Sequence, residues 1–202
     1  MSCTKLSSIS FPQCYIISQS AFCNCTSLAS ISFPVCSTIG YGAFSGCTKL
    51  QSAYFPSCMS ISSYAFYRCT SLTTASFPSC SVVHDSAFQQ CSSLSSISFP
   101  ICSYVANDAF YMCWSLTSVN LPSCTTIGFD AFGNCSALVS VSIPLCEMIT
   151  GGNFNGCSSL TSVNIPLCSY IGYSAFQGCT ALTSVSFPIC TYIGYNAFNG
   201  CT

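Results

Sequence analysis

The sequence predicts a repeat solenoid, a stack of nine coils of 22 residues, and three observations carry this prediction. Cysteine recurs every eleven residues from Cys3 to Cys201, which accounts for 19 of the 20 cysteines. The full period is 22 residues, because all nine prolines fall in a single column at that spacing. Two further columns, which begin at Leu6 and Phe22, hold leucine and phenylalanine without exception. Self-similarity at a fixed period of this length is the signature of stacked repeats.

The first half of each repeat predicts a strand, with the pattern L-x-x-(I/V/A)-x-F-P. In LTSVSFP (182–188), Val185 and Phe187 lie two apart and share one face, while Ser184 and Ser186 point the other way. The proline ends the strand because it has no N–H to donate to a ladder. Stacked in register, these segments give each strand a hydrogen-bonded neighbour in the next coil.

The second half of each repeat, C-x-x-I-G-x-x-A-F-x-G-C, is rich in glycine and small polar residues. It predicts turns with short helical or extended pieces on the other face. A lone coil cannot bury its apolar side chains, so the whole chain, 1–202, is expected to be one stacked domain, with no evident caps. The segment EMITGGNFNGC (147–157) departs most from the pattern, since Asn153 stands where alanine is the rule, and a local distortion is expected there.

Charge is nearly absent from the chain, which has three basic and four acidic residues. Nucleic-acid binding requires several phosphate contacts, and membrane-surface binding requires a basic cluster, so both are excluded. No apolar run reaches the length of a membrane-spanning helix, and no basic segment followed by an apolar one marks a signal peptide. The scattered carboxylates make no calcium cage, and no histidine accompanies the thiol columns, so neither a metal nor a cofactor is predicted.

The cysteine columns are as regular as the leucine and phenylalanine columns, which indicates that cysteine serves as a small buried apolar residue. Mostly reduced thiols are expected; disulfides between neighbouring coils are the alternative, because the strand spacing is at the short end of disulfide geometry. Cys23 lies outside both columns and is predicted to be an exposed thiol, available for intermolecular linkage. A neutral surface substitution is the simpler interpretation of Cys23.

The tripeptide HDS (84–86) contains the three residue types of a catalytic triad. Triad side chains must converge in space, whereas three consecutive side chains on a turn diverge. His84 also occupies a column of small, outward-pointing residues and is expected to be a surface histidine. No nucleophile and base converge elsewhere in the pattern, so the chain is not expected to be an enzyme.

The run LTSVSFP…CTYIGYNAFNGCT resembles the BspA-type (Treponema-type) leucine-rich repeat, and the match extends over all nine repeats. The resemblance implies a right-handed leucine-rich-repeat solenoid with a parallel sheet on one side. It also implies a non-enzymatic role in adhesion or binding, at the cell surface or outside the cell, and it transfers no catalytic residue. This chain is poorer in lysine and acidic residues than the common pattern and has a second cysteine column, from Cys14 to Cys190.

The outward positions of the predicted strands make a flat, uncharged face with two rows of hydroxyl groups. Three interpretations of this face are open: solvated strand residues, a recognition surface for a glycan or a host protein, and an ice-binding surface. Ice-binding faces favour threonine, whereas serine dominates here. The face comprises Ser8, Ser10, Ser30, Ser32, Ser52, Tyr54, Thr74, Ser76, Ser96, Ser98, Ser118, Asn120, Ser140, Ser142, Ser162, Asn164, Ser184 and Ser186.

Aromatic residues near the C-terminal end are a second candidate binding surface. Tyr170, Tyr173, Tyr192 and Tyr195 fall on the return side, where they could form a pad that stacks on sugar rings or could simply cover a hydrophobic edge. Trp114 replaces the serine or threonine of every other coil and is a candidate contact residue.

Both end coils are expected to expose leucine, isoleucine and phenylalanine side chains. Two explanations are open. The chain is a segment of a longer protein, or its ends join head to tail in a homo-oligomer or filament.

Overall fold

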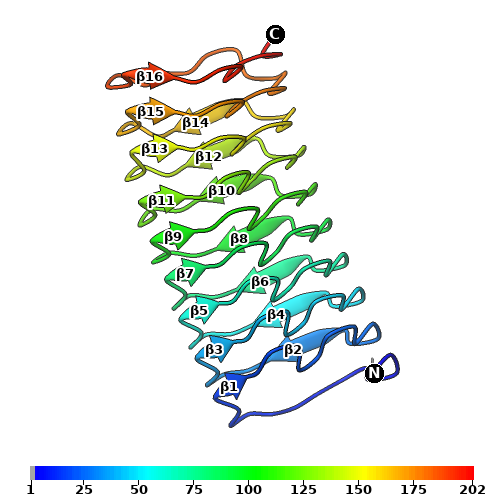
Figure 1. Cartoon of the computed structure of the whole chain (residues 1–202). Helices are drawn as coiled ribbons and strands as arrows, with labels where there is room; N and C mark the ends of the chain where they lie inside the picture. Colours follow the sequence, from blue (N-terminus) through cyan, green and yellow to red (C-terminus); the bar gives the residue numbers. More distant parts are fainter. Residues whose placement is uncertain (1–2) are drawn as a thin grey trace.

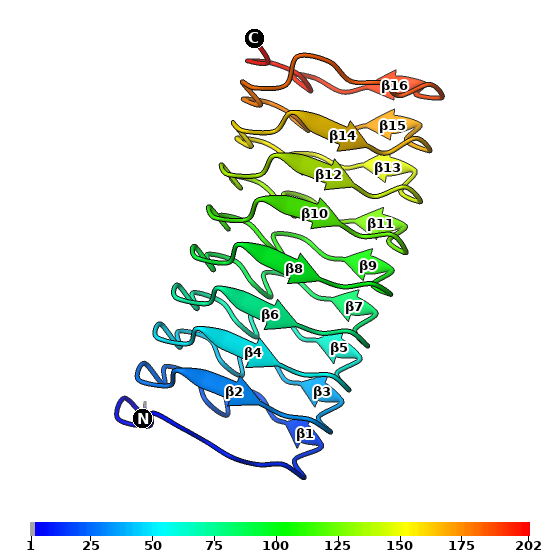
Figure 2. The same ribbon diagram turned by 180° about the vertical axis from the view of Figure 1, so that it is seen from behind.

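Two sets of short parallel strands run along the described residues, 3–202, of the computed structural model (Figures 1 and 2). The first set, on the side that we call the hydroxyl face, has three-residue strands in sheets of four and three strands. These are β2 (Ser30–Ser32), β4 (Ser52–Tyr54), β6 (Thr74–Ser76), β8 (Ser96–Ser98), β10 (Ser118–Asn120), β12 (Ser140–Ser142) and β14 (Ser162–Asn164).

The second set, which we call the return ladder, has two-residue strands in sheets of six and three strands. These are β1 (Ile16–Ile17), β3 (Thr38–Ile39), β5 (Ser60–Ile61), β7 (Val82–Val83), β9 (Tyr104–Val105), β11 (Thr126–Ile127), β13 (Met148–Ile149), β15 (Tyr170–Ile171) and β16 (Tyr192–Ile193).

The register of both sets matches the 22-residue period. Ser30 pairs with Ser52 on the hydroxyl face, and Ile17 pairs with Ile39 on the return ladder. Equivalent residues of successive coils therefore lie one above another, as the sequence predicts.

Phenylalanine stacks form the centre of the core. The column from Phe22 to Phe198 stacks nearly parallel, with centroids 5.2 Å apart at the first pair and 5.3 Å apart at Phe44–Phe66. A second stack, from Phe11 to Phe99, meets the first edge-on, as in the Phe55–Phe66 pair at 72°. Offset-stacked and edge-to-face pairs are the favourable aromatic geometries.

The turns between the two ladders also stack, through backbone hydrogen bonds between coils. Phe44 N–H donates to the Ala65 carbonyl at 2.8 Å, and most other coils repeat this bond. Two positions in every coil have left-handed backbone conformations, for example Gly42 (φ 57°) and Gly46 (φ 73°). The described chain therefore turns without any helix, and the short helical pieces predicted for this side are wrong. Extended pieces, the other form predicted there, are present as the return ladder.

The leucine-rich-repeat solenoid predicted from the sequence is confirmed, with two differences in detail. The side opposite the hydroxyl face carries a second parallel ladder rather than turns alone. The segments at 8–10 and 184–186, predicted as strands, are not strands, although the same end coils carry β1 and β16 on the return ladder.

Candidate functional site

The hydroxyl face brings the predicted outward residues into two rows. Cα partners across three coils are Ser52, Thr74 and Ser96 in one row, and Tyr54, Ser76 and Ser98 in the other. The intervening residues point inward, and Ala53 is buried. All of the predicted face residues are exposed or half-buried, although Ser8, Ser10, Ser184 and Ser186 lie outside the strands.

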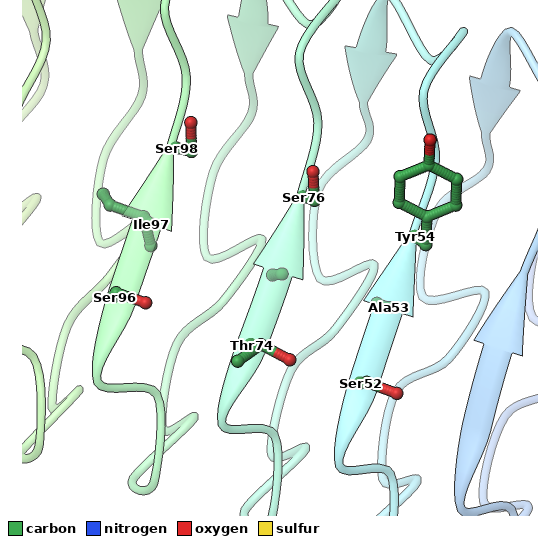
Figure 3. A pocket seen from close by; sticks show the side chains of 9 residues that line it. Ser52, Ala53, Tyr54, Thr74, Ser76, Ser96, Ile97 and Ser98 are labelled. Atoms are coloured by element: carbon green, nitrogen blue, oxygen red, sulfur yellow. The ribbon is translucent and has the colours of Figure 1, made fainter.

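A shallow groove of about 360 Å³ lies across β4, β6 and β8 (Figure 3). Its floor contains Ala53 and Ala75, where other coils place isoleucine or valine, and Ile97 is left partly exposed beside them. The Tyr54 ring stands at the end of the groove and is 50% exposed. The groove thus combines hydroxyl groups with a small apolar floor and one aromatic ring.

No charged side chain lines this groove. The carboxylates of Asp108 and Asp130 lie instead in the turns beyond the return ladder, in adjacent coils. Burial raises the pKa of Asp108, and the nearby carboxylates of Asp130 and Asp85 raise it further. Burial alone raises the pKa of Asp130. A ligand of the groove must therefore be recognised by hydroxyl groups and apolar contact, without ion pairs.

Inside the stack, from Cys25 to Cys179, the two cysteine columns are buried as predicted, and their thiols make different hydrogen bonds. In the first column, each thiol from Cys47 onward donates to a phenylalanine carbonyl of the preceding coil, as Cys47 does to Phe22 at 3.1 Å. In the column of Cys58, each thiol donates within its own coil, as Cys58 does to the Ser60 carbonyl at 3.3 Å. All the cysteines of the described chain are free thiols.

Burial controls the acidity of these thiols. It raises the pKa of Cys47, Cys58 and Cys80 to about 12, and that of Cys69 well above its usual range. Protonated, desolvated thiols are poor nucleophiles and poor metal ligands. Both columns are therefore structural.

Cys23, predicted to be exposed, is half-buried, and the Asn24 side-chain amide donates to its sulfur at 3.4 Å. The exposed thiol of the described chain belongs instead to Cys3, in the first coil. Cys3 follows the column pattern but lies in the first coil, where the described chain stacks on one side only.

The aromatic candidates fall into separate places rather than one pad. Tyr170 and Tyr192 stack at 4.6 Å on the return ladder. Tyr173 lies directly against Gly151 and within 6.2 Å of Phe129, whereas Tyr195 is 80% exposed. Trp114 is exposed in the turn after Cys113, outside both ladders.

The tripeptide 84–86 does not form a triad. His84 is half-buried, Ser86 is buried, and the Asp85 carboxylate accepts a hydrogen bond from Asn107 N–H at 3.1 Å, in the next coil. Among residues 3–202, no group of three or more His, Cys, Asp or Glu side chains is placed to hold a metal ion. The described chain also has no helix of the length and apolarity needed to cross a bilayer.

The groove was not predicted from the sequence, although the sequence contains one signal of it. In two consecutive coils, Ala53 and Ala75 replace the isoleucine or valine that other coils place at the inward position of the strand. Tyr54, in the outer row of serines, marks the same place.

Comparison with solved structures places the fold among bacterial leucine-rich repeat proteins. The T. pallidum leucine-rich repeat protein is 30% identical, with a TM-score of 0.59 over 84% of this chain and 72% of that chain. A leucine-rich cell surface protein of Faecalibacterium prausnitzii is 21% identical, with a TM-score of 0.54 over 92% and 74% of the two chains. A leucine-rich repeat protein of Eubacterium ventriosum is 18% identical, with a TM-score of 0.51 over 92% and 80%.

No match was found among curated proteins. The family model for the BspA-type leucine-rich repeat region matches residues 1–104 and 81–202, and no catalytic family is indicated. These two matches together span the entire sequence. The chain therefore belongs to the BspA-type leucine-rich repeat family.

Proposed function

We propose that this chain is a non-enzymatic adhesion module of a cell surface, and that its hydroxyl face binds a neutral glycan. The observation that carries this proposal is the uncharged groove over β4, β6 and β8, where two rows of hydroxyl groups flank an apolar floor (Figure 3). Sugars offer hydroxyl groups for the rows and C–H faces for the Tyr54 ring. The family supports a surface location, as does the F. prausnitzii relative described as a cell surface protein.

A glycan array with purified chain tests this proposal, followed by calorimetry on each glycan that binds. Tyr54→Ser restores the residue found in the neighbouring coils and should weaken binding by about fivefold, since stacking on an aromatic ring contributes about 1 kcal/mol. Tyr104→Thr makes the corresponding change on the return ladder and should leave affinity unchanged. Equal losses in the two variants, or no binding across the array, would contradict the proposal.

The face does not favour ice. The two rows contain one threonine, Thr74, and the exposed Tyr54 ring interrupts the flat surface. The third interpretation of the face therefore has no supporting observation, and absence of thermal hysteresis is the expected result.

End-to-end association is a second candidate property, favoured by the exposure of core columns at both ends. Phe11 is 49% exposed at one end, and Ile193 is 60% exposed at the other, whereas their equivalents inside the stack are buried. A further coil, on the same chain or on a second copy, would cover each of them.

Sedimentation velocity of residues 1–202 over a hundredfold concentration range tests whether a second copy does so. Self-association should increase with concentration and disappear in the Phe11→Asp/Ile193→Asp variant, in which like charges meet at the joint. A monomer at every concentration would rule out this property for the chain.

A further inference from the structure

One interface between coils is open on the return ladder. At other interfaces, two backbone bonds flank each strand pair, such as Ser169 N–H to Glu147 carbonyl (2.9 Å) and Gly172 N–H to Ile149 carbonyl (2.7 Å). Between β11 and β13, the equivalent bonds from Glu147 N–H and Thr150 N–H do not form. Within residues 3–202, this is the one place on the return ladder where neighbouring strands do not pair.

The core is widened at the same interface. Phe132 and Phe154 are 5.8 Å apart, whereas their neighbours Phe110–Phe132 and Phe154–Phe176 are each 5.3 Å apart. The opening therefore extends from the surface into the phenylalanine stack.

The side chain at position 150 explains the lost bond. The N–H at this position in each coil approaches the preceding coil so closely that a Cβ on Gly172 would lie 2.6 Å from backbone carbon. The bond measures 2.7 Å for Gly172 and lengthens to 3.0 Å for His84 and 3.1 Å for Ser62. Thr150 is β-branched and crowds the preceding coil most, so its N–H is displaced, and its hydroxyl donates to the Ile127 carbonyl at 3.3 Å instead.

Asn153 holds the opening in place. Its side chain is fully buried in the alanine column and donates to the Thr150 hydroxyl at 2.7 Å and to the Thr150 carbonyl at 3.2 Å. Its Oδ1 accepts from Ala131 N–H in the preceding coil at 3.3 Å. The departure of this coil from the repeat pattern is thus a satisfied polar network, and the distortion expected from the sequence is confirmed.

The opening is a slot of about 350 Å³, lined by Thr125, Thr126, Ile127, Glu147, Met148 and Thr150. It presents the Glu147 carboxylate, the released Thr125 carbonyl and the released Glu147 N–H, beside the apolar side chain of Met148. Met148 is 50% exposed.

The charge around the slot selects a cation. Glu147 is the charged residue among those that line the slot, and no basic residue lies there. A long cationic side chain matches this set: its stem suits Met148, and its head group suits the carboxylate and the carbonyl.

We propose that this slot binds a lysine- or arginine-bearing peptide segment of a partner protein. The cationic head group binds the Glu147 carboxylate and the Thr125 carbonyl, and a carbonyl of the peptide accepts from Glu147 N–H. An added strand does not fit, because the stack is widened by only a fraction of the strand spacing. The site is independent of the glycan proposal, since it lies on the return ladder and shares no residue with the groove.

The experiment is an NMR titration of the isotopically labelled chain with the blocked tripeptide acetyl-Gly-Lys-Gly-amide. Chemical-shift changes should concentrate on the amides of Thr126, Ile127, Glu147, Met148 and Thr150. The uncharged peptide acetyl-Gly-norleucine-Gly-amide has the same stem and should bind at least about fivefold more weakly. Raising the salt concentration should weaken binding of the lysine peptide in the same way. Shifts scattered over the molecule, or equal responses to both peptides, would overturn the proposal.

Two variants separate charge from shape. Glu147→Gln should weaken binding of the lysine peptide by about fivefold. Asp85→Asn removes a carboxylate outside the slot and should leave this binding unchanged. Thr150→Gly/Asn153→Ala restores the residues of the other coils, closes the slot and should abolish the localised shifts. Binding that survives in this variant with a native circular dichroism spectrum would show that the slot is not the site; if the variant fails to fold, Glu147→Gln decides.

Discussion

Cysteine in this chain serves both as an apolar core residue and as a hydrogen-bond donor. The Cys91 thiol links two coils through the Phe66 carbonyl at 3.1 Å, while Cys80 bonds to Val82 in its own coil at 3.2 Å. A thiol suits both places because it is small and apolar, yet can satisfy a buried carbonyl. Serine would satisfy the carbonyl but would lose apolar contact.

The buried thiols predict loss of stability in alkali. Their pKa in the folded chain, about 12 for Cys47, Cys58 and Cys124, lies above the ordinary value of 9.0, so folding is favoured below pH 9 and this contribution declines from pH 9 to 12. Each such thiol loses about 1.4 kcal/mol per pH unit in that window. Urea unfolding under reducing conditions should show a sharp fall in the free energy of unfolding between pH 8.5 and about 10.

A matched control identifies the thiols as the cause. Cys124→Ala should be less stable at pH 7 but should show a shallower decline above pH 9 by about one thiol's share. An identical slope in the two proteins would assign the alkaline loss to other groups.

Left-handed residues are the second feature that acts at the residue scale. Met112 has φ 61° in a column where other coils place Gly156 (φ 71°) or Gly178 (φ 74°). A left-handed conformation costs a residue with a side chain about 1 kcal/mol, and glycine does not incur this cost.

Met112→Gly should therefore be more stable than Met112→Ala by about 1 kcal/mol in urea denaturation. Both variants lose the same side chain, so the comparison isolates the backbone. Conversely, Gly178→Ala should lower the free energy of unfolding by about the same amount. A Cβ at this position would lie 3.7 Å from its nearest neighbours, so the backbone conformation and not a clash sets the cost. Equal stability of the two Met112 variants would show that the turn relaxes.

At the scale of the element, the sequence predicts the period, the strand register and the buried columns, since these follow from residue types that recur without exception. The second ladder was not predicted as a sheet, because Ile-Gly after a small polar residue is too short a signal to separate a two-residue strand from a turn. Pairing with the neighbouring coils makes this segment a strand, as in the register of Ile39 with Ile61. The groove and the slot depend on which side chains are missing or displaced in neighbouring coils, and a single repeat contains no such information.

The open interface predicts a stabilising pair of substitutions. Thr150→Gly/Asn153→Ala should restore the two backbone bonds between the coils of β11 and β13 and raise the free energy of unfolding by about 1–2 kcal/mol. Hydrogen exchange of the amides at 147 and 150 should slow at the same time.

A variant that leaves the stability unchanged and the two amides in fast exchange would show that these residues do not cause the opening. Asn153→Ala alone is the informative intermediate. It removes the buried amide but leaves Thr150 in place, so it should be destabilised by the unpaired Ala131 N–H.

At the scale of the whole molecule, the chain is a one-dimensional stack, in which each coil contacts only its neighbours. Groove and slot lie on different sides of the coil and at different heights: β4–β8 for the groove, β11–β13 for the slot (Figures 1 and 2). A glycan and a cationic peptide could therefore occupy the same molecule together. The hydroxyl face also has a discontinuity, since β8 and β10 do not pair, but the return ladder is continuous there.

The open interface has a mechanical consequence for a protein that bears tension along its axis. Joints in series yield first where a ladder is broken, and two such joints are present in the described stack: β8–β10 on the hydroxyl face and β11–β13 on the return ladder. At each joint the sheet on the other side is continuous and acts as a strap. Under tension, the molecule should open at these joints and swing about the straps, leaving the coils on either side intact and able to close again.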